Sequence, residues 1–190
     1  GTIGTSIVKI FDLTVAATGL NEKFLKAKNY NYKTITIVKP HHASYYPGAT
    51  DIIFKIIFDP ETGKIYGAQA VGNNGVDKRI DVFATAMTFG AKAEDLFHID
   101  LAYAPPYSTA KDPVMYTGMI LENAIKKERK VVTPLEVMEK REEFTIIDVR
   151  AEEEYENGHI DGPVNIPFDK LQEKSKEIDK KIKIAVHCNK

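Results

Sequence analysis

IIFKIIFDPETGKIYGAQAV, residues 52–71, decides the fold of the first part of the chain. Its opening IIFKIIF is apolar apart from one lysine, a composition typical of a buried strand. DPETG, residues 59–63, favours a tight turn. Apolar residues return in KIYGAQAV. The stretch therefore predicts two antiparallel strands, 52–58 and 64–71, joined in a hairpin.

Further elements are expected on both sides of this hairpin. Segments of β-branched or alternating apolar residues predict strands, and apolar residues at helical spacing predict helices. Strands followed by helices that pack on one face of an antiparallel sheet make an α+β domain. The strands are expected within 5–19 and at 33–39, and the helices at 22–28 behind the capping residue Asn21, at 76–89 before Gly90, and at 93–97.

A stiff loop is expected at LAYAPPYSTAKDP, residues 101–113. Pro105 and Pro106 fix two φ angles and remove two backbone donors, so neither a helix nor a central strand fits. Tyr103 and Tyr107 flank the prolines, and a rigid loop of this kind can present phenolic hydroxyls to a ligand. The alternative is a loop that packs on the sheet, which composition alone favours.

A helix follows this loop. Asp112 suits the N-cap and Pro113 the first helical position, and apolar residues recur at helical spacing as far as about Lys127. The apolar faces of this helix and of helix 76–89 exceed what one small sheet covers. We therefore expect residues 1–130 to form a homodimer.

The last third of the chain has a different pattern. Residues 1–130 are net basic and residues 131–190 net acidic, which indicates a domain boundary near 130. Thr133 and Glu136 form a capping-box signature around Pro134. Strands then alternate with helices, as in an α/β domain with a parallel sheet. The strands are expected at 144–149, 164–166 and 182–187, and the helices at 151–157 and from Asp169 to about 178.

Cys188 is the single cysteine of the chain and follows the last expected strand. One cysteine excludes an intrachain disulfide and suggests a reducing compartment, so we expect a cytoplasmic protein. Functional sites in open α/β folds lie at the carboxyl ends of strands, which makes Cys188 a candidate nucleophile. The alternative is a small, buried, apolar cysteine.

Composition argues against several other classes of partner. The net charge is −1, so neither nucleic acid nor an anionic membrane is indicated. The sequence contains no apolar run of membrane length and no signal peptide. His41 and His42 have no evident third ligand, and adjacent side chains point apart. We expect a surface loop there and no metal site.

Residues 131–190 resemble the rhodanese-like domain. Within 144–168 the sequence IIDVRAEEEYENGHIDGPVNIPF has the strand, acidic helix, GHI-x-G and N-I-P of that family, and a strand ending in Cys188 follows. The resemblance implies that Cys188 carries a persulfide. It also implies that the loop cradling this sulfur follows Lys190. We therefore expect the domain to be incomplete after the Cys188 strand, and the cysteine to be inert in this chain alone.

Residues 1–130 resemble the dimerisation domain of pyridine nucleotide-disulfide oxidoreductases, and more narrowly the coenzyme A-disulfide reductase and NADH oxidase branch. The phrases that carry the resemblance are GTSIVKIFDLTVAATGLNE, DPETGKIYGAQAVG, DVFATAMTFGAKAEDL and LAYAPPYSTAKDP. It implies a parent enzyme that uses FAD and NAD(P)H on coenzyme A (CoA) disulfide or CoA persulfide. The binding domains for both cofactors are expected before Gly1. This chain alone is expected to bind neither cofactor and to be inactive.

The same resemblance implies the site residues. The best matches to two tyrosines that reach the partner subunit's redox cysteine are Tyr103, in LAYAPPYS, and Tyr45, in HHASYYPGA. Tyr46 and Tyr107 are their neighbours and remain open as alternatives. Tyr103 would lie near the partner's flavin, together with Ala104 and Pro105 of the same loop. A rival hypothesis is a sulfurtransferase or sulfur carrier in which only Cys188 is chemically active.

Overall fold

The structure, a computed structural model, describes residues 2–126, 131–176, 178 and 183–188. The chain divides into two compact units, Gly1–Val131 and Val132–Lys190. Each is described by itself.

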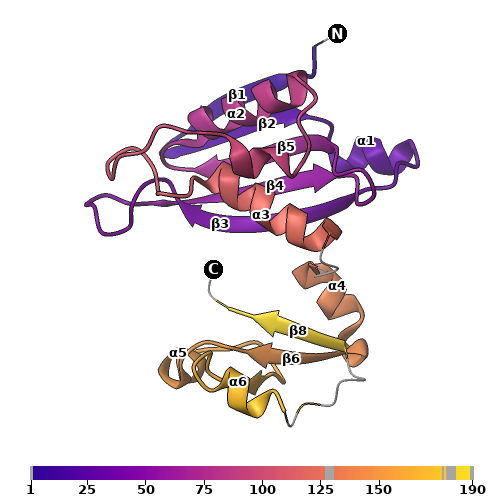
Figure 1. The fold of residues 1–190 in the computed structure, drawn as a ribbon, viewed down its shortest axis with the longest axis vertical. Coiled ribbons are helices and arrows are strands. Elements are labelled where there is room, and N and C mark those ends of the chain that lie inside the picture. The colour runs from indigo at the N-terminus through magenta and orange to yellow at the C-terminus, as the bar shows by residue number, and fades with distance from the viewer. Residues whose placement is uncertain (1, 127–130, 177, 179–182, 189–190) are drawn as a thin grey trace. The chain divides into compact units, whose positions relative to one another are not determined.

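The first unit contains a five-stranded antiparallel sheet in the order β1-β2-β5-β4-β3 (Figure 1). The expected hairpin is confirmed at its centre, where Ile53 pairs with Val71. Its turn is held by the Gly63 amide, which donates to the Asp59 carbonyl at 3.0 Å. The strands are β1 (Thr5–Ile10), β2 (Leu13–Gly19), β3 (Lys33–Pro40), β4 (Asp51–Phe58) and β5 (Ile65–Gly72).

Two helices cover one face of this sheet, α2 (Val76–Thr88) and α3 (Pro113–Lys126) (Figure 1). The short helix η1 (Asp95–His98) packs against α3. α1 (Glu22–Ala27) lies at one end of the sheet and begins as expected, because the Asn21 side chain accepts from the Phe24 amide at 2.9 Å. The fold of the first unit is thus the α+β arrangement expected from the sequence.

The core of the first unit lies between the sheet and these helices. Alternate residues of the central strands are fully buried there, including Phe54 and Ile56 of β4, together with Phe83 of α2 and Leu121 of α3. Exposed apolar side chains are frequent on the first two strands and their turn, and Phe24, Ile53 and Phe89 are further exposed apolar residues of this unit. Those on the first two strands and their turn are Ile7, Val8, Ile10, Phe11, Leu13 and Val15.

The second unit is built around a three-stranded parallel sheet in the order β7-β6-β8. The expected capping box is confirmed: Thr133 Oγ1 accepts from the Glu136 amide at 3.2 Å, and the Glu136 carboxylate accepts from the Thr133 amide at 2.7 Å. The elements are α4 (Pro134–Glu139), η2 (Arg141–Glu143), β6 (Phe144–Asp148), α5 (Glu152–Glu156), β7 (Val164–Asn165), α6 (Leu171–Lys174) and β8 (Lys183–His187).

Three details differ from the expectations. The helix expected from Asp169 to 178 is the shorter α6, and Lys170 rather than Asp169 occupies its N-cap position. β8 is an edge strand, and only Ala185 in it is buried. In α2, the buried face includes Arg79, a charged residue that the apolar pattern passed over. Residues 127–130, which include the expected helix end at about Lys127, and Ile182, the first residue of the last expected strand, lie outside the described residues.

Candidate functional site

Two tyrosines from distant parts of the chain meet at one end of the first unit. Tyr45 lies in the β3–β4 loop and Tyr103 in the segment between η1 and α3, yet their hydroxyl oxygens are 3.2 Å apart. Both side chains reach solvent, Tyr45 with 75% of its surface exposed and Tyr103 with 47%. The two loops project from the same end of the sheet (Figure 1). The site is therefore an exposed pair of hydrogen-bonded phenols.

Backbone hydrogen bonds join the two loops. The Ala43 amide donates to the carbonyls of Pro105 (3.3 Å) and Ser108 (3.0 Å). The Ala104 carbonyl accepts from the amides of Tyr107 and Ser108, which closes a turn around the prolines. The Ala104 carbonyl is thus used within the Tyr103 loop, and the Pro105 carbonyl joins this loop to the one that carries Tyr45.

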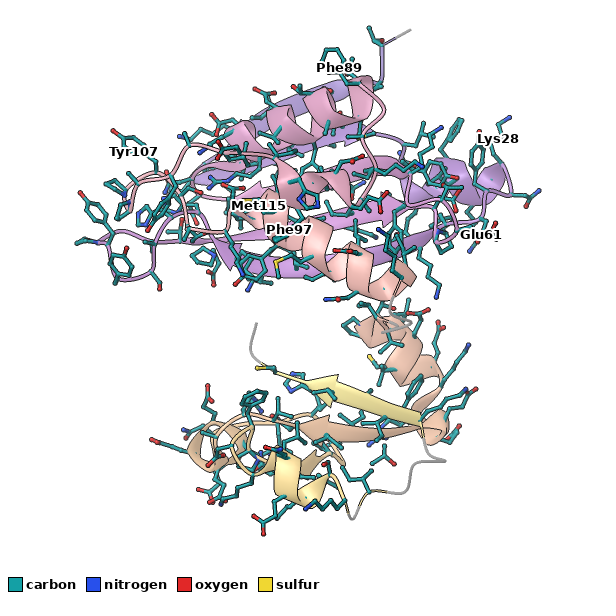
Figure 2. All side chains as sticks on the ribbon, viewed as in Figure 1. Lys28, Glu61, Phe89, Phe97, Tyr107 and Met115 are labelled. Atoms are coloured by element: carbon teal, nitrogen blue, oxygen red, sulfur yellow. The ribbon has the colours of Figure 1, made fainter. Side chains whose placement is uncertain are left out.

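The neighbouring tyrosines have other surroundings. The Tyr46 ring stands edge-on to the His42 ring, with centroids 5.6 Å apart. Tyr107 is 72% exposed and marks the tip of the loop, at the opposite end of the unit from Lys28 and Glu61 (Figure 2). Of the four tyrosines considered from the sequence, the structure brings together Tyr45 and Tyr103.

The two histidines lie at the start of the loop that carries Tyr45, and His41 is hydrogen-bonded to the residue at its end. The Thr50 amide donates to His41 Nδ1 at 3.1 Å, and the His41 amide donates to the Thr50 carbonyl at 2.9 Å. Burial lowers the pKa of His41, and the nearby charge of Arg79 acts in the same direction. His42 is 5% exposed, so the expectation that both histidines lie on the surface is wrong. Among the described residues, no group of three or more His, Cys, Asp or Glu could hold a metal ion.

The contact between the two hydroxyls changes the pKa of Tyr103. The hydrogen bond between the two hydroxyls raises the pKa of Tyr103, and partial burial adds to this effect. A phenol with a raised pKa stays protonated at neutral pH, so its hydroxyl is available as a hydrogen-bond donor. The pair is therefore suited to stabilising a sulfur anion by hydrogen bonding.

A buried ionic network behind the loops was missed by the sequence reasoning. The Arg79 and Asp112 side chains are each 2% exposed, and Arg79 Nη2 lies 2.9 Å from Asp112 Oδ2. Ser108 Oγ donates to the same carboxylate oxygen at 2.6 Å. The sequence did contain a sign of this burial. Helical spacing places Arg79 beside Ile80 on the face of α2 that Val76 and Phe83 define, and this face is the buried one.

In the second unit, Cys188 follows β8 directly and is exposed. The β6 residue Asp148 pairs in register with His187 and is fully buried. Arg150 Nη2 donates to Asp148 Oδ2 at 2.7 Å, and Arg150 Nε donates to both carboxylate oxygens at 3.0 Å. The Arg150 hydrogen bonds lower the pKa of Asp148 from 3.8 to about 2, against the opposing effect of burial. This ion pair fixes the end of β6 beside the Cys188 strand.

The lowered pKa of Asp148 predicts acid sensitivity of the second unit. The carboxylate binds its proton less readily in the folded than in the unfolded state. Its contribution to the free energy of unfolding is therefore full above about pH 5 and is lost as the pH falls towards 2. A shift of this size corresponds to about 2 kcal/mol. About half of this contribution should be lost between pH 6 and pH 3, which urea unfolding of the second unit at the two pH values measures.

We expect Asp148→Asn to destabilise the second unit at pH 6 and to flatten this pH dependence. The exposed Asp161, replaced by asparagine, is the matched control and should leave the pH dependence as it is. If the free energy of unfolding of Asp148→Asn still fell with pH as steeply as that of the unaltered protein, Asp148 would not be the source of the acid sensitivity.

The chain was compared with known families. Residues 5–114 match the pyridine nucleotide-disulphide oxidoreductase dimerisation domain, and residues 133–190 match the rhodanese-like domain. Both resemblances inferred from the sequence are thereby confirmed. No described helix is long and apolar enough to cross a membrane.

Individual relatives point the same way. A coenzyme A disulfide reductase of Staphylococcus epidermidis is 41% identical over 118 residues, which are 62% of this chain and 26% of that protein. The crystal structure of reduced Bacillus anthracis CoADR-RHD is 45% identical with a TM-score of 0.94, covering 99% of this chain and 34% of that one. An NAD-dependent persulfide reductase from A. fulgidus is 39% identical with a TM-score of 0.82, at the same coverage. The chain thus spans about a quarter of the length of the curated relatives it matches.

Proposed function

Because the chain belongs to the pyridine nucleotide-disulphide oxidoreductase dimerisation-domain family and continues into a rhodanese-like domain, we propose that it is part of a CoA-disulfide or CoA-persulfide reductase. The whole protein would use FAD and NAD(P)H. Residues 1–130 would supply dimerisation and complete the active site of the partner subunit, and residues 131–190 would supply the rhodanese-like part. The named relatives support both the disulfide and the persulfide as substrate.

The Tyr45–Tyr103 pair is the observation that carries this proposal. Cleavage of a disulfide by a cysteine thiolate expels a second thiolate, which must be stabilised or protonated. Two exposed phenols at 3.2 Å, one with a raised pKa, can donate to that sulfur. The bound flavin would supply electrons from the nicotinamide. The chain's own residues would hold the leaving sulfur and provide its proton.

The family resemblance implies that the attacking cysteine would come from another part of the whole protein. Cys188 is the only cysteine in the sequence and belongs to the second compact unit, whereas both tyrosines belong to the first. A site completed by a second subunit accounts for exposed hydroxyls that have each other as partners. The exposed apolar residues of β1 and β2 also support an interface of the first unit, because such surfaces mark sites of association.

Cys188 would serve as a persulfide carrier that passes sulfur to the reductase. Its exposure supports this role, because a carrier thiol has to meet both donor and acceptor. The single cysteine of this chain is not in a disulfide, which also fits the reducing cytoplasm. The same exposure keeps a second candidate open, a sulfur carrier in which only Cys188 is chemically active.

The test is made on the natural full-length protein. We expect a dimeric mass by light scattering, bound flavin in the visible spectrum, and NAD(P)H consumption with CoA disulfide or CoA persulfide. Comparing the two substrates side by side shows which one is preferred. A monomer would contradict the shared site, and a colourless protein that consumes no NAD(P)H would favour the carrier function.

A further inference from the structure

Arg79 lies buried behind the two loops that carry Tyr45 and Tyr103. Its whole residue is 1% exposed, which makes it one of the largest fully buried residues among those described. Burying a guanidinium costs free energy that an apolar side chain at the same place would not cost. The rest of the buried face of α2 is apolar, with Val76, Ile80, Phe83 and Ala86. Arg79 therefore needs an explanation other than core packing.

The hydrogen bonds of Arg79 supply that explanation, because they connect both loops. Nη2 donates to the His41 carbonyl at 2.7 Å, where the Tyr45 loop begins. The same nitrogen donates to Ser108 Oγ at 3.3 Å and to Asp112 Oδ2 at 2.9 Å, where the Tyr103 loop ends. Nη1 donates to the Gly75 carbonyl at 3.1 Å. One planar, rigid group thus ties the two loops to the start of α2.

Gly75 leaves the space that the guanidinium occupies. Its φ of 71° is a conformation that side chains rarely adopt. A Cβ at this position would lie 2.3 Å from Arg79 Nη1 and 3.3 Å from the Cβ of His41. A side chain at position 75 would therefore require both a rarely adopted backbone conformation and a displacement of the guanidinium.

The hydroxyl pair depends on this support. Hydrogen bonds between exposed side chains add little stability, so they do not fix the position of a loop by themselves. Tyr45 follows the Arg79 contact at His41 closely in sequence, and Tyr103 precedes the contact at Ser108. The Ala43 amide joins the loops between these points through the carbonyls of Pro105 and Ser108. The separation of the two hydroxyls is thus set by the backbone that Arg79 fixes.

We propose that Arg79 is a positioning residue that keeps the Tyr45 and Tyr103 hydroxyls within hydrogen-bonding distance, so that they act as one donor pair. The consequence for catalysis rests on the proposed function. The geometry of the hydroxyl pair does not rest on the proposed function, and it can be measured separately.

Two replacements of Arg79 separate positioning from folding. Arg79→Lys retains a charge for Asp112, but one ammonium cannot reproduce the planar fork that bridges both loops. Arg79→Leu combined with Asp112→Asn removes both charges, so no unpaired ion stays buried, and asparagine still serves as an N-cap. Leu121→Ala is the control, because Leu121 is a buried core residue of the same unit that belongs to neither loop and makes no hydrogen bond to Arg79.

The first readout is the ionisation of Tyr103 in the full-length holoenzyme. Tyrosinate absorbance is recorded against pH in each background, and the Tyr103 signal is obtained by subtracting the matching Tyr103→Phe variant. The hydrogen bond with Tyr45 raises the pKa of Tyr103, so this pKa should fall towards its ordinary value when Arg79 is replaced and the two hydroxyls separate. Leu121→Ala should leave it unchanged. A Tyr103 pKa that stays raised in both Arg79 variants would overturn the proposal.

The second readout is the turnover number for disulfide cleavage in a double-mutant cycle. We expect Arg79→Lys to lower turnover at least about tenfold in the native background and to have little further effect in Tyr103→Phe. The same fold-loss in both backgrounds would mean that Arg79 acts through stability alone, against the proposal. If Tyr103→Phe itself has no effect on turnover, the donor role proposed for Tyr103 fails, while the titration still decides the role of Arg79.

Discussion

Replacing Tyr103 with phenylalanine is expected to lower disulfide cleavage by the full-length enzyme about 10²–10⁴-fold, the usual contribution of a proton donor. The replacement removes one oxygen atom from a half-exposed side chain, so the fold should survive. The loss should appear in the turnover number more than in KM, because the leaving sulfur acquires its charge only as the disulfide breaks.

Tyr107→Phe is the matched control for this prediction. It removes a phenolic hydroxyl from the same loop, at an exposed position away from the Tyr45–Tyr103 hydrogen bond. Tyr45→Phe should resemble Tyr103→Phe, and the double replacement should cost little more than either single one, because the hydroxyls act as a pair. Full activity in Tyr103→Phe, measured as NAD(P)H consumption, would rule out its role as donor.

Replacing Cys188 with serine is expected to abolish sulfur transfer from thiosulfate or polysulfide and to spare NAD(P)H-dependent disulfide cleavage. A serine hydroxyl cannot form the persulfide, so no residual transfer through this residue is expected. The disulfide reaction uses the tyrosine pair and a different cysteine. The two activities should therefore separate completely in one variant.

Both activities have to be measured on the same preparation of the full-length protein. Disulfide cleavage then serves as the internal control for folding and flavin content. Asp148→Asn provides a comparison, because it disturbs the end of β6 beside the Cys188 strand but leaves the sulfur atom in place. It should reduce sulfur transfer without abolishing it. Equal loss of both activities in Cys188→Ser would contradict separate sites.

The sequence predicted those parts of the fold that depend on local chemistry. The 52–71 hairpin followed from an apolar run, a turn and a second run, and the structure has it. Asp112 was expected at an N-cap, and its Oδ1 accepts from the Val114 amide at 3.0 Å. Such signals involve residues a few positions apart, so they can be read without knowing what packs against them.

The sequence could not predict the features that depend on contacts between distant segments. It offered four tyrosines in two loops, and only the folded chain shows that Tyr45 meets Tyr103. Arg79 was passed over because an arginine within an apolar stripe is usually assigned to the edge of the buried face, and its partners lie far away in sequence. The helix after Asp169 was overestimated because short, charged helices gain little from propensity alone.

The strand order β1-β2-β5-β4-β3 has a consequence for how the first unit folds. Three of its four pairings, β1–β2, β3–β4 and β4–β5, join strands that are consecutive in sequence. Only β2 and β5, where Thr14 pairs with Gly72, require a long loop to close first. Loop closure of this kind slows folding more than local hairpin formation does. We therefore expect the joining of the β1–β2 ribbon to the three-stranded remainder to be the slow step in the folding of the first unit.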